Sequence, residues 1–205
     1  MTRSVICISR ALGAGGEEIG QGVAKTLGYR YVDDDIIVRA AESAGITPGE
    51  MAKAERPPSL VKRLLDSLGK TTVDPSGWAM QASLAAQEGP TAEAIIELAV
   101  KETAREGDAV IVAHGASIAL GRQVGVLRVL ITGSPDVRAD RLREAQGSSE
   151  DEALRTIERS DKARREYIER FYRTSEQPAH YDLIVNTDTL SAGKAAELIV
   201  AAAND

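Results

Sequence analysis

The sequence predicts an α/β protein with a parallel β-sheet of about five strands sandwiched by helices. Short apolar segments alternate with helical patterns along the chain, which is typical of strands joined by crossover helices. Two of these segments, DAVIVA (108–113) and VLRVLIT (126–132), are apolar almost throughout, as expected for strands buried on both faces of the sheet. A chain of 205 residues is long enough for a sizeable core, so we expect one domain over residues 1–205.

The N-terminal segment predicts a strand, a glycine loop and a helix. SVICIS (4–9) is a β-branched apolar strand that ends at a cluster of glycines. The apolar residues of the next segment recur at helical spacing: Ile19, Val23 and Leu27. Gly28 ends this helix, and YRYV (29–32) predicts a second, short strand that leads into three aspartates, residues 33–35.

The middle of the chain has mostly helical patterns, and we expect residues 36–105 to form an insert beside the sheet. Its alanine-rich segment 79–106 predicts a helix, which Pro90 should break or kink. This helix can cover the protein's own sheet or the surface of a second subunit, so a homo-oligomer is left open.

The C-terminal part predicts a second insert over residues 147–178. Ser149 and Glu152 form a capping box at the start of a charged helix that runs to about Tyr172. The other predicted elements are a helix that begins at Ser134 and Pro135, a last strand at 181–187 and a last helix at 191–203.

Charge and composition argue against several classes of partner. The net charge of −6 disfavours nucleic acid. The single cysteine, Cys7, excludes an internal disulfide and fits a reducing compartment. The apolar stretch at the N-terminus is too short for a signal peptide, and no segment approaches the roughly 20 apolar residues that cross a bilayer. We therefore expect a cytoplasmic protein that binds neither nucleic acid nor a membrane.

Residues 9–20, SRALGAGGEEIG, resemble a phosphate-binding loop without two of its usual side chains. The P-loop pattern G-x-x-x-x-G-K-[ST] uses a lysine for the β- and γ-phosphates and a hydroxyl for Mg²⁺. Here Gly16 stands in the place of the lysine, and the glutamates Glu17 and Glu18 stand where the hydroxyl is expected. The turn still directs backbone N–H groups and the positive end of a helix to the carboxyl edge of the sheet, where such folds bind ligands.

Other interpretations of this loop remain. The dinucleotide-binding pattern G-x-G-x-x-G fits Gly13 and Gly15 but requires glycine where the chain has Glu18. A tight turn that uses glycines only for positive φ and close packing is a further alternative. Glu17 and Glu18 either complement the helix dipole or, in the case of Glu18, ligate Mg²⁺. Because the loop has no lysine, its cations must be arginines, of which Arg10 is one candidate.

Four segments, in order along essentially the whole chain, resemble the cytidylate kinase-like family, a divergent branch of the nucleoside monophosphate kinases. They are ISRALGAGGEEIG (8–20), LGYRYVDDDII (27–37), VLRVLITGSPDVRADR (126–141) and ERSDKARREY (158–167). That branch characteristically lacks the loop lysine, in agreement with Gly16. The resemblance implies a P-loop NTPase-type fold in which residues 36–105 bind the nucleoside monophosphate (NMP) and residues 147–178 form the lid.

The resemblance also implies which residues form the site. It places ATP and Mg²⁺ at the loop, whose residues are Arg10, Gly13, Ala14, Gly15, Gly16, Glu17 and Glu18. Glu18 is the expected metal ligand on electrostatic grounds, because its carboxylate would repel a polyphosphate unless a divalent cation lay between them. Asp33 and Arg39 match positions that bind the substrate CMP, and His114, in the third strand segment, stands where these kinases commonly have arginine. The expected catalytic cations are the arginines of the lid, which are Arg159, Arg164 and Arg165.

Structural roles are the alternatives for these side chains. Asp33 can cap the following helix, Arg39 is ordinary on a helix surface, and His114 can be a hydrogen-bonded residue at a strand end. The lid arginines lie among carboxylates, so i,i+4 ion pairs on a solvated helix also explain them.

We therefore expect an ATP-dependent NMP kinase-like protein that transfers a phosphoryl group to CMP or a related small acceptor. Because the loop lacks the lysine and the hydroxyl, the alternative is a nucleotide-binding regulatory protein that keeps the kinase fold with weak or no catalysis. A third interpretation is a kinase for another small phosphorylatable substrate. All three have small-molecule nucleotides as partners.

Overall fold

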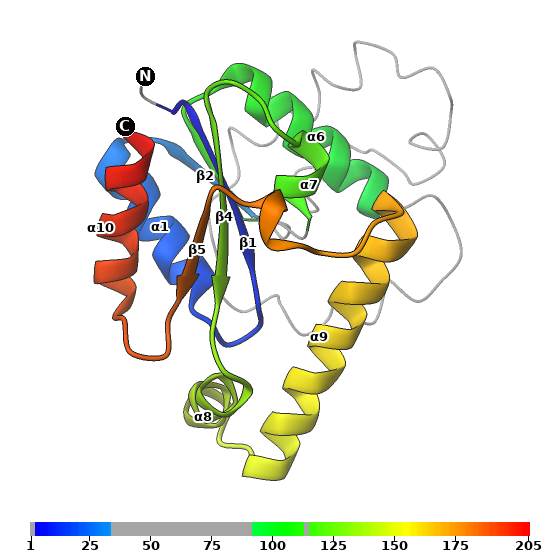
Figure 1. The fold of residues 1–205 in the computed structure, drawn as a ribbon. Helices are drawn as coiled ribbons and strands as arrows, with labels where there is room; N and C mark the ends of the chain where they lie inside the picture. Colours follow the sequence, from blue (N-terminus) through cyan, green and yellow to red (C-terminus); the bar gives the residue numbers. More distant parts are fainter. Residues whose placement is uncertain (1–2, 34–91, 113–114) are drawn as a thin grey trace. The chain divides into compact units, whose positions relative to one another are not determined.

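The computed structural model describes residues 3–33, 92–112 and 115–205 (Figure 1). It divides the chain into two compact units, which are Met1–Tyr31 with Asp108–Asp205, and Val32–Gly107. The predicted insert over residues 36–105 lies mostly outside the described residues. That insert and the single domain over residues 1–205 therefore stay predictions.

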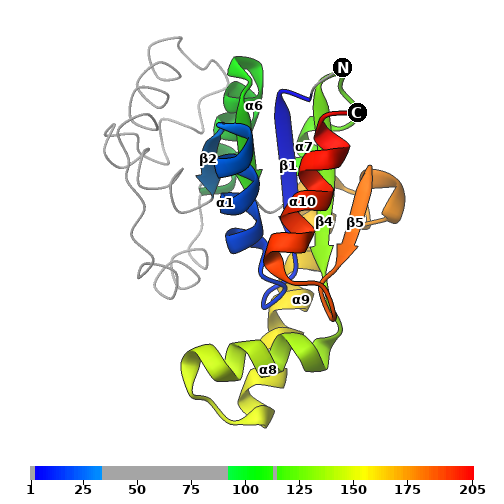
Figure 2. The same ribbon diagram turned by 90° about the vertical axis from the view of Figure 1, so that its left-hand side faces the viewer.

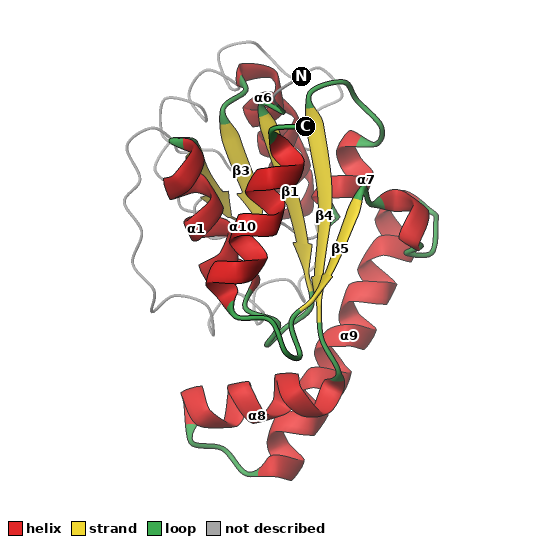
Figure 3. Ribbon diagram, turned by 60° about the vertical axis from the view of Figure 1, so that its left-hand side comes forward, coloured by secondary structure: helices red, strands yellow, loops and turns green. Residues whose placement is uncertain are grey.

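A parallel sheet forms the centre of the fold. Its strands are β1 (Val5–Arg10), β2 (Arg30–Asp33), β3 (Ala109–Val112), β4 (Val126–Thr132) and β5 (Leu183–Asn186). They lie in the order β2-β3-β1-β4-β5, and β1 pairs in parallel with both β3 and β4 (Figure 3). Every residue of β3 is buried, which explains its unbroken apolar sequence. The predicted parallel sheet is confirmed.

Helices cover both faces of the sheet. The helices α1 (Gly16–Leu27) and α10 (Ala192–Ala203) pack side by side on one face (Figure 2). The short helix α7 (Ala116–Leu120) lies on the opposite face, where the Ser117 hydroxyl is 3.3 Å from the Ser9 hydroxyl (Figure 1). Side chains alternate along a strand, so β1 directs Ile6 and Ile8 toward α1 and α10 and directs Ser9 toward α7. The predicted sandwich of helices is confirmed.

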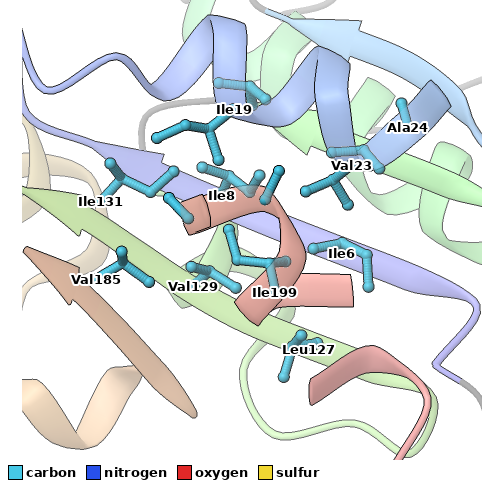
Figure 4. Packing of buried hydrophobic residues seen from close by; sticks show 14 of the residues in the cluster. Ile6, Ile8, Ile19, Val23, Ala24, Leu127, Val129, Ile131, Val185 and Ile199 are labelled. Carbon is cyan, nitrogen blue, oxygen red and sulfur yellow. The ribbon is translucent and has the colours of Figure 1, made fainter. Parts of the chain in front are cut away.

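The main core lies between the sheet and the pair of helices α1 and α10 (Figure 4). Its centre consists of isoleucines that are fully or almost fully buried: Ile6, Ile8, Ile19, Ile131 and Ile199. The helical spacing of Ile19 and Val23 therefore marks the buried face of α1, as the sequence predicts. Gly28 ends this helix with a φ of 71°, and its N–H bonds back to the carbonyl of Ala24.

The helices α8 (Pro135–Gln146) and α9 (Glu150–Tyr172) form a hairpin that extends beyond the carboxyl end of β4 (Figures 1 and 2). The hairpin has a small core of its own, which consists of Ala139, Leu142, Ala153 and Ile157. The Ser149 hydroxyl accepts the N–H of Glu152, and the Glu152 carboxylate accepts the N–H of Ser149. The predicted capping box is thus confirmed, and α9 lies within the predicted lid segment 147–178.

The helix α6 (Ala92–Glu106) belongs to the second unit and lies within the predicted helical segment 79–106. The predicted break at Pro90 lies outside the described residues. A short 3₁₀ helix, η2 (Pro178–His180), precedes β5. None of the helices in the described part of the chain combines the length and the apolar character that a bilayer-spanning helix needs.

Arg128, in the middle of β4, fixes the start of β5. Its guanidinium donates two hydrogen bonds to the Asp182 carboxylate, at 3.0 Å from Nε and 2.7 Å from Nη2, and its backbone N–H donates a third at 3.0 Å. These hydrogen bonds outweigh the effect of burial and hold the pKa of Asp182 below its ordinary value. On β1, burial raises the pKa of the Cys7 thiol to about 12 against the opposing charge of Arg128, so this thiol is unreactive at neutral pH.

We expect Ile199→Ala to lower the free energy of unfolding by about 2–5 kcal/mol, because it removes buried methyl groups and leaves a cavity. The matched control is Leu198→Ala on the same helix. Leu198 is 42% exposed, so its variant should stay within about 0.5 kcal/mol of the native chain. Urea denaturation followed by circular dichroism measures both, and equal losses would contradict this description of the core.

We expect Asp182→Asn to cost about 1–3 kcal/mol near neutral pH, since it removes charged hydrogen bonds to a buried guanidinium. The folded-state pKa of Asp182 lies below its unfolded value, so the pair stabilises the fold fully above the unfolded pKa. That contribution is lost as the pH falls through the folded-state pKa. The difference in unfolding free energy between the two proteins should therefore shrink toward about pH 3.

The control for this prediction is Asp140→Asn, since Asp140 pairs with Arg143 on the surface of α8 at 3.1 Å. It should change the unfolding free energy by less than about 0.5 kcal/mol at any pH. Denaturant titrations over a series of pH values give both curves. A cost of Asp182→Asn that is constant with pH would show that the charge of Asp182 does not contribute.

Candidate functional site

The loop of residues 11–15 joins β1 to α1 at the carboxyl edge of the sheet. Gly13 and Gly15 have φ values of 77° and 80°, in the left-handed region that glycine adopts without strain. A Cβ at Gly13 would lie 2.6 Å from the carbonyl oxygen of Arg138, so the backbone of α8 packs directly on the loop. Gly15 is the N-cap of α1 and provides no side-chain cap, which leaves the first amides of the helix to solvent or a ligand.

Arg10, the last residue of β1, lies beside the start of α1. Its side chain is only 8% exposed and packs on Gly16, where a Cβ would lie 2.6 Å from the Arg10 Cβ. The Nε of Arg10 donates a hydrogen bond to the Glu17 carboxylate, and Glu17 and Glu18 are both exposed in the first turn of α1. The residues predicted to bind the cofactor are therefore together in one loop and one helix start.

Arginines from α8 and α9 hold the carbonyl groups of this loop. Arg164 donates to the carbonyl at position 10, Arg138 to that at position 12 at 3.2 Å, and Arg141 to that at position 13 at 3.4 Å. The same helices that form the hairpin therefore determine the shape of the glycine loop.

Arg138 is a buried residue of the site to which the sequence analysis assigns no role. Its guanidinium pairs with both oxygens of the Asp161 carboxylate, at 2.9 Å and 2.7 Å, and its Nε donates to the carbonyl of Gly133 at 2.9 Å. The pair joins α8 to α9 next to the loop. The sequence does contain one indication that Arg138 is buried. Arg138 lies four residues before Leu142 and hence on the same, buried face of α8.

Directly after β5, Thr187 binds the loop and Asp188 binds the start of α8. The Thr187 hydroxyl donates to the carbonyl of Ala14 at 3.1 Å and lies 2.9 Å from Nη1 of Arg141. The Asp188 carboxylate accepts the backbone N–H of Ser134 at 2.7 Å, and this bond lowers the pKa of Asp188. The sequence analysis assigns neither residue a role, because their contacts come from segments distant in the chain.

Arg164 is buried and bonded to a carboxylate outside its own helix. Its Nε donates to Oε2 of Glu176 at 3.0 Å, and its Nη2 lies 3.4 Å from the hydroxyl of Tyr181. Burial by itself would lower the pKa of Arg164, but Glu176 raises it above its ordinary value. Burial acts to raise the pKa of Glu176, and the guanidinium lowers it instead. The alternative of an i,i+4 pair on a solvated helix is therefore wrong for Arg164.

A cavity of about 280 Å³ lies next to the loop, between the helical hairpin and the carboxyl end of β4. Its lining residues are Ala11, Leu130, Thr132, Arg138, Asp161, Arg164, Arg165, Glu169, Ser175 and Glu176. Arg138 and Arg164 face it while paired with carboxylates. Arg165 forms no hydrogen bond or ion pair within the described part of the chain, so its charge is available to a ligand.

Arg159 is separated from the other two predicted lid cations. Its Nε donates to the carbonyl of Arg155 at 3.2 Å, and its Nη2 donates to the hydroxyl of Thr156 at 3.2 Å. These bonds lie on the exposed surface of α9, and Arg159 does not line the cavity. The structure therefore places Arg164 and Arg165 at the cavity and Arg159 outside it.

The predicted substrate and metal ligands are only partly described. Asp33 is the half-buried last residue of β2 and belongs to the unit Val32–Gly107, whereas Arg39 and His114 lie outside the described residues. No group of three or more metal-ligating side chains occurs among the residues that the structure describes. Glu18 is exposed in the first turn of α1, and its role as a ligand of Mg²⁺ stays a prediction.

The chain is similar in fold to solved structures of low sequence identity. An uncharacterized protein from Eubacterium ventriosum is 16% identical, with 98% of each chain covered and a TM-score of 0.64. A shikimate kinase from Bacteroides thetaiotaomicron is 19% identical, with 97% of this chain and 94% of that chain covered and a TM-score of 0.46. A gluconokinase from Sinorhizobium meliloti is 15% identical, with 99% and 94% covered and a TM-score of 0.47. At such identities the likeness extends to the fold alone.

A comparison of the sequence with models of protein families assigns the chain to a family. A search of curated proteins finds no match. The model of the cytidylate kinase-like family matches residues 5–189, a span that includes the glycine loop, the helical hairpin and β5. The chain therefore belongs to the cytidylate kinase-like family.

Proposed function

We propose that the protein is an ATP-dependent kinase that transfers a phosphoryl group to CMP or a related small acceptor. The observation that carries the proposal is the glycine loop, whose uncapped helix start lies beside the buried guanidinium of Arg10. Membership in the cytidylate kinase-like family supports phosphoryl transfer as the reaction class. This reaction requires positioning and charge neutralisation rather than covalent chemistry, and amides and guanidinium groups provide both.

The loop binds the phosphates of ATP through its backbone. The first N–H groups of α1 have no partner within the helix, and the helix dipole favours an anion at this end. The left-handed conformations of Gly13 and Gly15 keep side chains away from that point. Glu18 is the proposed ligand of Mg²⁺, which neutralises phosphate charge when it is bound.

Arg165 is the proposed cation for the phosphoryl group during transfer. It lines the cavity and has no hydrogen-bond or ion-pair partner among the residues that the structure describes, and a planar guanidinium matches the oxygens of a phosphoryl group. Arg164 acts as a positioning residue, because its bonds to Glu176 and to the Arg10 carbonyl tie α9 to the end of β1. Arg159 stays a predicted further cation of the lid.

The proposed acceptor, CMP, contacts Asp33, Arg39 and His114, the positions where resembling kinases bind their substrate. A carboxylate at Asp33 accepts hydrogen bonds from the nucleoside, and a guanidinium at Arg39 pairs with its phosphate. The reaction would take place on small-molecule nucleotides in the cytoplasm.

A nucleotide-binding protein without catalysis is the second candidate. It is favoured by the loss of the loop lysine and hydroxyl and by the pairing of Arg164 with Glu176. Thermal shifts with ATP–Mg²⁺ and a panel of nucleoside monophosphates measure binding, and a coupled ADP-release assay measures turnover. Binding without ADP release would favour the second candidate, and release only with a non-nucleotide acceptor would favour a kinase for another small substrate. Failure of both assays would exclude every candidate.

We expect Gly13→Ala to weaken ATP–Mg²⁺ binding by about tenfold or more, because the new Cβ meets the Arg138 carbonyl and displaces the loop amides. Gly28→Ala is the matched control, since Gly28 is also left-handed but its Cβ would meet nothing within 4 Å. Both variants should lose about 1–2 kcal/mol of stability from backbone strain. Gly13→Ala should lose more through its steric clash, and only this variant should lose ATP affinity. Equal ATP affinities in calorimetric titrations would remove the loop from the proposal.

We expect Arg165→Ala to lower kcat about a hundredfold, in line with the removal of one donor to a transition-state charge. Both Arg165 and the control residue Arg155 are exposed on α9, so neither variant should change the unfolding free energy by more than about 0.5 kcal/mol. Arg155→Ala should leave kcat unchanged. If kcat is unchanged in Arg165→Ala as well, Arg165 is not the catalytic cation.

A further inference from the structure

We infer that Arg10 performs the role of the missing loop lysine, because this chain has exchanged the side chains of positions 10 and 16. The exposed carboxylate of Glu17 holds the guanidinium of Arg10 until a phosphate group takes its place. The inference rests on the proposed binding of ATP phosphates at the loop and identifies the cation that binds them.

The exchange is visible when positions 10 and 16 are aligned with the P-loop pattern. With Gly15 as the second glycine of G-x-x-x-x-G-K, the first glycine falls at position 10 and the lysine at position 16. The chain has arginine where the first glycine belongs and glycine where the lysine belongs. One cation and one glycine are therefore retained, with their places exchanged.

Positions 10 and 16 lie too close together for both to carry a side chain. A Cβ at Gly16 would lie 2.6 Å from the Cβ of Arg10 and 2.8 Å from its Cδ. The Cβ of Arg10 is fixed by a buried strand and cannot move away as the end of a flexible side chain can. Only one of the two positions can carry a side chain in this backbone, so arginine at position 10 requires glycine at position 16.

The charge of Arg10 requires a neighbouring anion. The side chain of Arg10 is 8% exposed and lies at the positive end of the α1 dipole, where a cation is unfavourable without an anion beside it. One partner of Arg10 is the carboxylate of Glu17, which accepts a hydrogen bond from Nε. The Glu17 side chain is 48% exposed, so it can turn into solvent at little cost. A phosphate group would then bind the guanidinium and the helix amides together.

The exchange is tested by calorimetric titration of the full chain with ATP–Mg²⁺ and, separately, with inorganic tripolyphosphate. Arg10→Gly should lower the affinity for both ligands by about tenfold to a hundredfold, and Arg10→Lys should lose less. Gly16→Lys should lose stability through the steric clash and gain no affinity. The double variant Arg10→Gly/Gly16→Lys restores the usual pattern and should bind more tightly than either single variant.

The role of Glu17 is tested with Glu17→Gln. Because the carboxylate competes with phosphate for Arg10, this variant should bind both ligands about twofold to fivefold more tightly than the native chain. In the background of Arg10→Gly the same change should give a smaller gain. Glu144→Gln, an exposed charge change on α8, controls for net charge, and Arg122→Gly controls for the loss of an exposed arginine.

Circular dichroism and the unliganded melting temperature show whether each variant folds, and Arg10→Gln replaces Arg10→Gly if the latter does not. Unchanged affinity in the Arg10 variants, with ATP bound by the native chain, overturns the inference and leaves the proposed function intact. A native chain that binds tripolyphosphate through Arg10 but does not bind ATP overturns the proposed function alone. Binding of neither ligand overturns both, and a double variant no better than Arg10→Gly overturns the exchange.

Discussion

Three guanidinium groups from two helices hold the backbone carbonyls at positions 10, 12 and 13, and the candidate site depends on these bonds. They come from Arg164, Arg138 and Arg141. A loop with two left-handed glycines has little intrinsic stiffness, so its shape must be fixed by contacts from outside. One of these helices, α9, also carries Arg165, which lines the cavity beside the loop. The loop amides that would hold a phosphate and the arginine proposed to neutralise it during transfer therefore belong to one bonded cluster.

The charges of this cluster are arranged so that few cations remain for a ligand. Arg138 and Arg164 are buried, and each is paired through two hydrogen bonds with one carboxylate, namely Asp161 and Glu176. Such geometry offsets the large cost of removing an arginine from water. Arg10 differs, because Glu17, a carboxylate that it pairs with, is half exposed, and Arg165 differs because it has no partner in the described part of the chain. Among the described arginines that contact the loop or line the cavity, these two are the ones that we propose an anionic ligand recruits.

Membership in the cytidylate kinase-like family and the absence of a loop lysine from the sequence fit together once the packing of β1 on α1 is known. A lysine at position 16 has no room beside Arg10, and Arg10 has no room beside any larger residue at that position. The loss of the usual lysine is therefore one half of a paired change, and its consequence for function depends on where the guanidinium of Arg10 can reach. The arginines of α9 divide in the same way, since Arg164 and Arg165 line the cavity and Arg159 bonds to its own helix.

The sequence by itself determined the parallel sheet, the helices on both faces and the capping box of α9, because these follow from local periodicity and from backbone groups a few residues apart. It also located the glycine loop and the arginines of the segment predicted to be the lid. Tertiary structure alone decided which of those arginines are committed to a partner, since Arg164 finds Glu176 beyond the end of its helix. The buried Arg138 and the Thr187 hydroxyl became part of the site only when distant segments came together. Contacts between residues so far apart in the chain produce no periodic pattern in the sequence. They depend on how the connections between strands bring distant segments together.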